Sequence, residues 1–331
     1  MISTVPGNYP KIANRRGGQT LRRAIASFDR GRISADELAA AADEVTIEVI
    51  GEQERAGIDV IADGQIRWQD PVTYIAGKLD GYEIGGLIRY FDTNTFYRQP
   101  EATGRIAWQG PILVHDYEFA RDHASGPVKP VVTGPYTIAK LSLLGSYAVS
   151  DEVVDLQTLV LDTARALNQE MKALAATDPP LIQVDEPAIV WHRYKGDWAI
   201  FKEAMDVLMD GVGATTLLRT DFGDAVGLPD FFALPFQGFG LDMVHGKGNL
   251  ALVPEFPDDR DLMLGIIDAR NVRMETEEAV LESVRYATEH VCRERLAISP
   301  NTGLEFLPRE TAYDKLQNMV HAVKKAQEAV A

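Results

Sequence analysis

Short apolar runs typical of buried strands alternate along this chain with longer segments in which apolar residues recur at helical spacing. The strand-like runs cover residues 58–62, 112–114, 128–133, 181–184, 214–218, 241–244, 262–267 and 296–299. The amphipathic segments between them include residues 151–176, 198–210, 276–295 and 308–331. Alternation of this kind predicts a mainly parallel sheet whose strands are connected by helices.

Eight strand-like runs distributed over 331 residues favour a closed (β/α)8 barrel over an open sheet. The chain has no Gly-x-Gly-x-x-Gly sequence after a strand and no Gly-Lys-Ser/Thr loop, which argues against the common dinucleotide and P-loop folds. Residues 85–100 interrupt the alternation and predict a small hairpin inserted between barrel units. Because the sequence shows neither a linker nor a repeat, we predict a single α/β domain, a TIM barrel, over residues 1–331.

The charge balance is strongly acidic, with 33 Lys and Arg residues against 49 Asp and Glu residues and a formal net charge of -16. Nucleic acids and anionic membranes bind clustered cations, so this balance argues against both as partners. The absence of a secretory leader and of any run of about 18 apolar residues predicts a cytoplasmic protein. The single cysteine, Cys292, excludes an intramolecular disulfide, and its helical surroundings predict that it is buried.

Residues 181–188 lead from a strand-like stretch straight into two adjacent acids, Asp185 and Glu186, and then into Pro187, which ends the strand. In α/β proteins the carboxyl ends of the strands carry the chemistry, so both acids are candidates for a functional site. A second interpretation is that these acids cap the helix that follows. The segment alone leaves both interpretations open.

Polar residues follow the other strand-like runs as well, and in a parallel barrel the loops after the strands all lie on one face. The residues expected there include Asp63, Gln65, Thr133, Asp185, Glu186, Arg219, Asp221, His245, Lys247, Asp268 and Arg270. A cup of this composition can bind an amino acid or another small carboxylate, because an Asp accepts from an ammonium and an Arg holds a carboxylate. His245 is the candidate acid or base whose unperturbed pKa lies closest to neutrality. The alternative for each residue is a structural role, such as a helix-capping Asp.

Several short motifs occur in one order along nearly the whole chain. They lie at residues 5–10 (Val-Pro-Gly-Asn-Tyr-Pro), 63–67, 96–100, 133–138, 182–188 (Ile-Gln-Val-Asp-Glu-Pro-Ala), 265–268, 300–304 (Pro-Asn-Thr-Gly-Leu) and 316–320. In sequence and order these motifs resemble the cobalamin-independent methionine synthase family, specifically its C-terminal catalytic barrel and its short single-barrel relatives. The resemblance implies a TIM barrel that moves a methyl group from a folate, or from another donor, to the thiol of homocysteine.

The residues at the positions of the family's zinc site differ in this chain. In the family, His, Cys, Glu and Cys hold a zinc ion that binds the acceptor thiol as a thiolate and lowers its pKa. The resemblance places Arg219, Asp221, Val244 and Thr302 at these positions. An Arg at a ligand position also opposes a metal cation electrostatically. The resemblance therefore predicts that zinc is not bound and that the chain has no metal ligands.

Part of the family's amino-acid site is retained. The resemblance places Asp185 where the family holds the amino group of homocysteine, and it places Gln65 where the family has a second acid. Gly7 and Asn8 match the loop whose backbone contacts the substrate carboxylate. The predicted substrate-binding residues are Gly7, Asn8, Gln65, Asp185, Glu186 and Asp268.

Two further differences bear on the chemistry. Leu141 stands where the full-length enzymes of the family have a Trp that stacks on the pterin, which argues against a folate cofactor. Arg270 stands where those enzymes have a His that supplies a proton. The predicted catalytic residues are Asp221, His245, Arg219 and Arg270.

Three functions are compatible with these observations. The first is a divergent methyltransferase that works without zinc on a small amino-acid or thiol acceptor, which Arg219 would stabilise as an anion or Asp221 with His245 would deprotonate. The second is a lyase or hydrolase acting on a small carboxylate, with Asp185, Asp221 and His245 as its acid and base groups. The third is a non-catalytic paralogue that binds a small molecule. The fold alone does not distinguish them, and a homo-oligomer is compatible with each.

Overall fold

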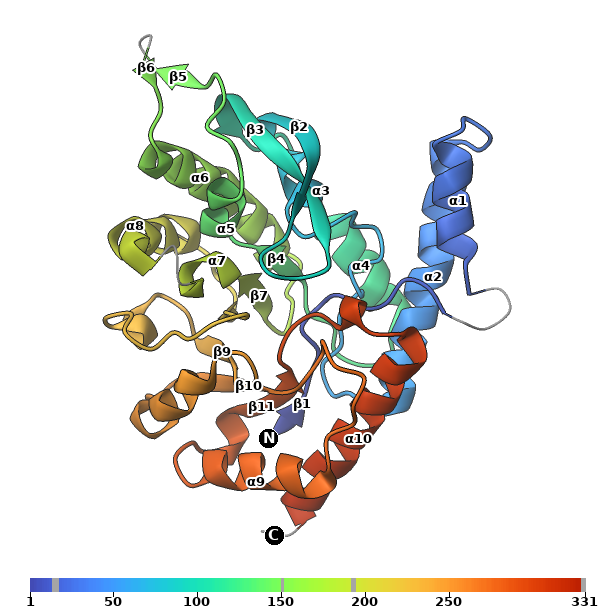
Figure 1. Cartoon of the computed structure of the whole chain (residues 1–331), viewed down its shortest axis with the longest axis vertical. Helices are drawn as coiled ribbons and strands as arrows, with labels where there is room; N and C mark the ends of the chain where they lie inside the picture. Colours follow the sequence, from blue (N-terminus) through green and yellow to red (C-terminus); the bar gives the residue numbers. More distant parts are fainter. Residues whose placement is uncertain (14–17, 150–151, 192–194, 329–331) are drawn as a thin grey trace.

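A parallel sheet of seven strands forms the centre of the computed structural model, which describes residues 1–13, 18–149, 152–191 and 195–328 (Figure 1). The strands are arranged in the order β1-β11-β10-β9-β8-β7-β4. They comprise β1 (Ile2–Ser3), β4 (Val131–Thr133), β7 (Ile182–Asp185), β8 (Thr216–Arg219), β9 (Gly238–Asp242), β10 (Asp261–Ile267) and β11 (Leu296–Pro300). Because the strands all pair in parallel, their carboxyl ends lie at one edge of the sheet.

Residues 59–62 close the sheet into a barrel between its two edge strands. On one side Val60 bridges Thr4, and the backbone N–H of Val60 donates to the carbonyl of Ser3 at 3.2 Å. On the other side Ile61 bridges Val128 ahead of β4. This segment supplies the eighth strand position, and the predicted (β/α)8 barrel is confirmed.

Helices follow the strands and cover the outside of the barrel (Figure 1). The α-helices are α1 (Thr20–Phe28), α2 (Ala35–Ala56), α3 (Thr73–Ala76), α4 (Val114–His123), α5 (Pro135–Lys140), α6 (Leu156–Ala175), α7 (Pro187–Val190), α8 (Trp198–Met209), α9 (Glu277–Thr288) and α10 (Arg309–Glu328). The predicted amphipathic segments correspond to α6, α8, α9 and α10, while residues 151 and 329–331 of those predictions lie outside the described residues. Helix α2 has clear sequence signals at both ends, since Ser34 and Glu37 form a capping box and Gly57 ends the helix with a φ of 87°.

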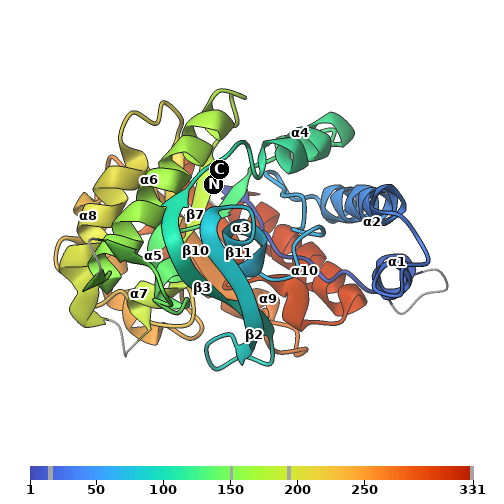
Figure 2. The ribbon, with the colours of Figure 1, turned by 90° about the horizontal axis from the view of Figure 1, so that it is seen from above.

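The predicted hairpin is present and extends over the face of the barrel where the strands end. Strand β2 (Asp80–Arg89) pairs antiparallel with β3 (Phe96–Ala107), and the hairpin crosses in front of the barrel strands in Figure 2. The guanidinium of Arg270 donates to the carbonyl of Asp92 in the hairpin tip at 2.9 Å. The ring of Phe91 lies 5.6 Å from that of Phe222, between their centroids. These contacts fix the tip on the barrel. A second, smaller pair joins β5 (Ala148–Val149) to β6 (Glu152–Val153).

The strand predicted at residues 112–114 is wrong, because this run leads into α4. The backbone N–H groups of Ile112 and Leu113 donate to the buried carboxylate of Glu170 in α6, at 2.8 and 2.7 Å. The same carboxylate accepts from Trp108 Nε1 at 2.7 Å. A side chain 57 residues away therefore replaces the neighbouring strand that the pattern predicted. The first barrel strand, β1, was not predicted because only Ile2–Ser3 form it.

Cys292 is exposed, which contradicts the predicted burial. Helix α9 ends at Thr288, so the cysteine lies beyond the helix and its thiol donates to Glu294 at 2.8 Å. Within the described ranges, none of the helices combines the length and the apolar character needed to cross a bilayer.

We predict that Glu170→Ala lowers the free energy of unfolding by about 3 kcal/mol, because Ile112, Leu113 and Trp108 all lose their acceptor. Urea unfolding followed by circular dichroism measures the change. The matched control is Glu203→Ala, which removes an exposed glutamate from α8 and should change stability by less than about 0.5 kcal/mol. Equal losses in the two variants would contradict the assigned role of Glu170.

Candidate active site

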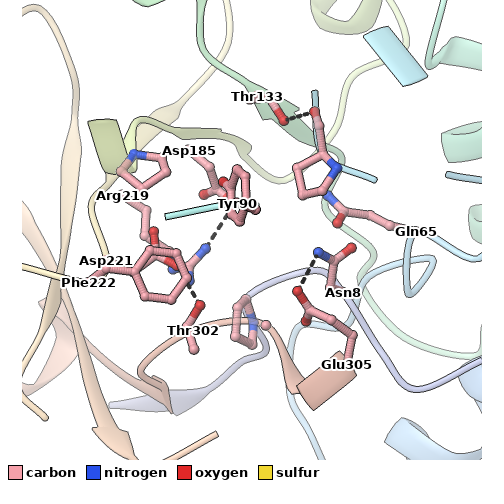
Figure 3. Close-up of a pocket in the computed structure, with 14 residues that line it drawn as sticks. Asn8, Gln65, Tyr90, Thr133, Asp185, Arg219, Asp221, Phe222, Thr302 and Glu305 are labelled. Carbon is pink, nitrogen blue, oxygen red and sulfur yellow. Dashed lines mark hydrogen bonds and ion pairs between the residues drawn. The ribbon is translucent and has the colours of Figure 1, made fainter. Parts of the chain in front are cut away.

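A small polar pocket opens where the barrel strands end (Figure 3). It is lined by residues from the loops after several strands and by the hairpin tip, and these include Asn8, Tyr90, Asp185, Arg219, Asp221 and Glu305. The enclosed space is about 20 Å³, which is room for about one water molecule. Of the residues predicted from the sequence, the structure brings together Asn8, Gln65, Thr133, Asp185, Arg219 and Asp221.

The guanidinium of Arg219 lies at the centre of this pocket. Arg219 is the last residue of β8, and its Nη1 donates to Asp185 Oδ2 at 2.8 Å while its Nη2 donates to Asp221 Oδ2 at 2.9 Å. Nη2 also lies 3.3 Å from the carbonyl oxygen of Asn301. Arg219 therefore points into the cup and pairs with the acids on both sides, whereas Asp224 accepts from the backbone of Gly248.

Asp221 is bound on one side only. Its Oδ2 accepts from Arg219 and, at 2.5 Å, from the hydroxyl of Thr302. Its Oδ1 is buried without a hydrogen-bond partner. Burial raises the pKa of Asp221 to about 6, although the guanidinium of Arg219 opposes the shift. At neutral pH this carboxyl is mostly ionised and has one free acceptor oxygen.

Asp185 is held from two directions. Gln183 Nε2 donates to its Oδ1 at 2.7 Å, and Arg219 donates to its Oδ2. Burial raises its pKa, and Arg219 opposes this shift as well. The side chain of Asp185 remains 19 % exposed, so a ligand in the pocket can still reach the carboxylate.

Glu305 belongs to the pocket although the sequence analysis did not select it. Its Oε1 accepts from Asn8 Nδ2 at 3.1 Å, and its Oε2 is buried without a partner. Burial raises its pKa to about 7. Glu305 directly follows the motif at residues 300–304, so an acid in the loop after the last strand was the signal available in the sequence. Tyr90 was also missed, because it reaches the pocket from the hairpin.

His245 lies beside the pocket and is bound to its surroundings. Its Nδ1 is 3.2 Å from Asp242 Oδ2 and 2.8 Å from Asn301 Nδ2. The hydrogen bond to Asp242 raises the pKa of His245. Both Asp221 and His245 lie in the described part of the chain, and they share no hydrogen bond. Asn301 connects the two regions, because its carbonyl accepts from Arg219.

The structure places Glu186, Asp268 and Arg270 outside the lining of the pocket. The fully buried carboxylate of Glu186 accepts from the backbone N–H groups of Tyr136 and Thr137, at 2.9 and 2.7 Å, at the start of α5. It therefore caps α5, the helix after β4, and its side chain does not cap α7, the helix that follows it, as the second interpretation of the sequence had it.

Asp268 and Arg270 lie in the loop after β10 and make structural hydrogen bonds there. Asp268 Oδ1 accepts from the backbone N–H of Arg270 at 2.9 Å and so closes its own turn. The guanidinium of Arg270 lies over the ring of Phe222, 5.7 Å from its centroid, while it bonds the carbonyl of Asp92. Arg270 thus ties the hairpin tip to the barrel.

Gly7 packs against the pocket from the loop after β1. It has a φ of 138°, and a Cβ at this position would lie 3.2 Å from Gln65 Nε2 and 3.3 Å from Val131. A glycine is needed here because of both the backbone conformation and the close approach of Gln65. The loop of Gly7 and Asn8 therefore runs tightly along the rim of the pocket.

The sequence resemblance aligns Arg219, Asp221, Val244 and Thr302 with the family's zinc ligands, and these residues carry a guanidinium, a carboxylate, an aliphatic side chain and a hydroxyl. The cationic group of Arg219 lies between the acids, and Thr302 donates to Asp221. Zinc sites use thiolate, imidazole and carboxylate donors, so this set does not fit the family's zinc. Among the described residues, no group of three or more His, Cys, Asp or Glu side chains is arranged to hold a metal ion.

The residue that the sequence resemblance aligns with the family's pterin platform, Leu141, is covered. Leu141 is buried, and its carbonyl accepts from the hydroxyl of Tyr97 at 2.7 Å and from Gln99 Nε2 at 3.2 Å. Both donors belong to strand β3 of the hairpin. A flat ring therefore has no exposed face at this residue.

A closed barrel with convergent polar side chains at the carboxyl ends of its strands defines the class of (β/α)8-barrel enzymes. The family model described as "Cobalamin-independent synthase, N-terminal domain" matches residues 83–292. The chain is 32% identical to the methionine synthase of Sulfurisphaera tokodaii, over 98% of this chain and 92% of that protein. It is 31% identical to the methionine synthase of Saccharolobus solfataricus, over 98% and 95% of the two chains. The chain therefore belongs to the cobalamin-independent methionine synthase family.

Solved structures agree with this assignment at the level of the fold. A B12-independent methionine synthase from Shewanella sp. W3-18-1 superposes with a TM-score of 0.80 at 20% identity and covers 99% of this chain and 98% of its own. A methyltransferase from Methanosarcina mazei superposes with a TM-score of 0.60 at 12% identity, over 98% and 94% of the two chains. The family predicted from the motifs is confirmed. The matching model describes the N-terminal domain of the family, whereas the sequence motifs resemble the C-terminal barrel.

We predict that Arg219→Met lowers the free energy of unfolding by about 3–5 kcal/mol at pH 7, because Asp185 and Asp221 lose their counter-charge. The loss should shrink at pH 5, below the pKa of about 6 of Asp221, since a neutral carboxyl needs no cation. Urea unfolding at both pH values tests this. Arg295→Met, which removes the exposed ion pair with Asp261, is the control and should cost less than about 1 kcal/mol at either pH. A loss independent of pH would refute the ion-pair account.

Proposed function

We propose that this protein is a methyltransferase for a small amino-acid-like acceptor and that it works without the zinc of its family. The observation that carries the proposal is the array of Asp185, Arg219 and Asp221 at the ends of β7 and β8. It occupies positions where the family has zinc ligands and retains the acid that holds the amino group. The relatives named methionine synthase and methyltransferase support a transferase.

The composition of the pocket supports an amino-acid-like ligand. Its carboxylates, Asp185, Asp221 and Glu305, outnumber the single guanidinium of Arg219, which favours a ligand ammonium. The loop of Gly7 and Asn8 is available for the ligand carboxylate. The Shewanella methionine synthase was crystallised in complex with selenomethionine, an amino acid of this kind.

A larger cavity beside the pocket provides room for a second substrate. It measures about 400 Å³ and shares Asn8, Pro71 and Glu305 with the pocket. Methyl transfer requires donor and acceptor side by side, and cavities of this size hold small organic ligands. Lys11 lines the cavity, and burial lowers its pKa to about 8, so it is mostly cationic at neutral pH. We assign the methyl donor to this cavity.

Asp221 takes over the activation that zinc provides elsewhere in the family. The proton on the acceptor atom passes to Asp221 Oδ1, which has no other partner. The electron pair left on the acceptor attacks the methyl carbon, and the bond from that carbon to the donor breaks with its electrons staying on the donor. Arg219 keeps Asp221 ionised before the transfer and stabilises the anion that forms.

The pocket must open before a ligand can bind, because its space holds only about one water molecule. Tyr90 in the hairpin tip lines the pocket, and the tip is held by the bond from Arg270 to Asp92. We therefore assign Arg270 to closing the tip over the bound ligand. The lyase or hydrolase alternative needs Asp221 and His245 to act together, and Asp242 and Asn301 hold His245 in another network.

We expect Asp221→Asn to lower kcat/KM by about 100-fold or more, because the amide cannot accept the acceptor's proton. In the parent enzyme kcat/KM should rise with pH through about 6, where Asp221 ionises, and this rise should be absent in the variant. Methylation of homocysteine, with methyl donors supplied in turn, provides the assay. Asp206→Asn, on the exposed side of α8, is the control. A variant that keeps the parent's pH profile would eliminate Asp221 as the base.

We expect Asp185→Asn to weaken the binding of L-methionine by about 10-fold to 100-fold, because an amide replaces the charged partner of the ligand ammonium. Isothermal titration calorimetry at pH 7 measures the dissociation constant. Circular dichroism establishes whether the variant keeps its fold. Unchanged affinity in a folded variant would exclude Asp185 from the ligand site.

A further inference from the structure

A lysine lies inside the barrel and has no role in the reaction described above. Lys129 is 1% exposed, and its Nζ donates to Gln183 Oε1 at 2.6 Å and lies 4.0 Å from Met263 Sδ. Burial lowers its pKa to about 7. An ammonium in the interior lowers the stability of the fold unless it is paired. Its hydrogen bond to Gln183 therefore indicates a specific role for the two side chains.

The side-chain amide of Gln183 uses all its strong hydrogen-bonding groups. Its Oε1 accepts from Lys129, and its Nε2 donates to Asp185 Oδ1 at 2.7 Å and to the carbonyl of Pro6 at 2.6 Å. A protonated lysine offers only donors, while an ionised carboxylate and a carbonyl offer only acceptors. The amide therefore fits in one orientation, and its flipped form would face like groups at all three contacts.

We propose that Lys129 and Gln183 are a positioning pair that sets the separation between the Asp185 carboxylate and the loop of Pro6, Gly7 and Asn8. Lys129 anchors the oxygen of the amide, and the amide holds the two sides of the amino-acid site together. This inference rests on the proposed function for the identity of the ligand. The hydrogen bonds themselves are independent of it.

The topology of the barrel separates the two groups that the amide of Gln183 connects, the carbonyl of Pro6 and the carboxylate of Asp185. Strand β1 consists of Ile2–Ser3, and its sheet partner is β11, whereas Asp185 ends β7 several strands away. The bond from Gln183 to Pro6 spans 177 residues of sequence and crosses the barrel interior between these strands. It connects the binding site for the ligand ammonium directly to the loop that faces the ligand carboxylate.

Removing the ammonium should release the amide. In Lys129→Met the oxygen of Gln183 loses its donor and stays buried without a partner. The amide is then no longer held on the side of position 129, so its two bonds to Asp185 and Pro6 loosen and Asp185 is less well placed for a ligand ammonium. In Gln183→Leu the amide is absent, so Lys129 no longer has a hydrogen bond through which it affects the position of Asp185.

A double-mutant cycle on ligand binding tests the proposal. We use L-methionine as the probe and measure its dissociation constant by calorimetry for Lys129→Met, Gln183→Leu and the double variant. Each single substitution should raise the dissociation constant by about 10-fold, and the double variant should match Gln183→Leu alone. Met263→Leu, which changes the neighbour of Lys129 and leaves Gln183 bonded, should stay within about twofold. Multiplicative losses in the double variant would show separate packing roles and overturn the proposal.

Gln183→Glu keeps the experiment decisive if the other variants fold poorly. Its carboxylate can pair with Lys129, but its second oxygen faces the acceptors of Asp185 and Pro6 and cannot donate to them. The dissociation constant for L-methionine should rise by at least about 10-fold. Parent-like binding by a folded Gln183→Glu protein would overturn the proposal.

A measurement without ligand separates this proposal from the proposed function. The side-chain NH₂ protons of Gln183, assigned by their loss in Gln183→Leu, should exchange slowly with solvent in the parent protein. They should exchange about 10-fold faster in Lys129→Met and at the parent rate in Met263→Leu. Slow exchange that depends on Lys129, in a protein that does not bind L-methionine, would support the pair and contradict the amino-acid ligand. Exchange unaffected by Lys129→Met would overturn the pair.

Discussion

The guanidinium of Arg219, shared between Asp185 and Asp221, is the interaction on which the site depends. Burial raises the pKa of both acids, and without a cation between them they would become neutral near physiological pH. The barrel itself fixes this geometry, because Asp185 and Arg219 are register partners at the ends of β7 and β8. The proposed chemistry thus begins with strand pairing, and neither acid could be placed correctly in a barrel with another register.

An arginine can replace only part of what a metal ion does. Both present positive charge to a developing anion, but a guanidinium has no vacant coordination position and only donates hydrogen bonds. It can form an ion pair with a thiolate but cannot coordinate the sulfur, so it lowers the pKa of a thiol less than zinc does. The proposed mechanism needs a separate acceptor for the proton, and the unpartnered Oδ1 of Asp221 is such an acceptor in the same pocket. The change at Arg219 is consistent with Asp221 having become the base.

The sequence predicted the barrel and much of the pocket, because periodicity and the residues after strands are local signals. It located Asp185, Arg219 and Asp221 for this reason. It failed where a distant group decides the outcome, as at residues 112–114, where the acceptor is Glu170 in another helix. Tyr90 was missed because a hairpin tip is placed by tertiary contacts that leave no periodic pattern. Glu186 lies next to Asp185 in sequence, yet neighbouring residues of an extended chain point in opposite directions. The carboxylate of Asp185 therefore contacts Arg219, while that of Glu186 contacts Thr137.

The size of the pocket connects the binding site to the hairpin. We propose that an amino acid enters when the hairpin tip moves, because the pocket has about 20 Å³ of free space and Tyr90 is part of its lining. The tip is held by one hydrogen bond from Arg270 and by ring contacts among Phe91, Phe222 and their neighbours, which are few enough to break and form again during turnover. The barrel interior below is buried by contrast, and Gln183 there is bonded to Lys129, Asp185 and Pro6. In this proposal the barrel interior fixes the acids and the hairpin tip covers them, and exclusion of water by the tip would strengthen the electrostatic effect of Arg219 on the transferred group.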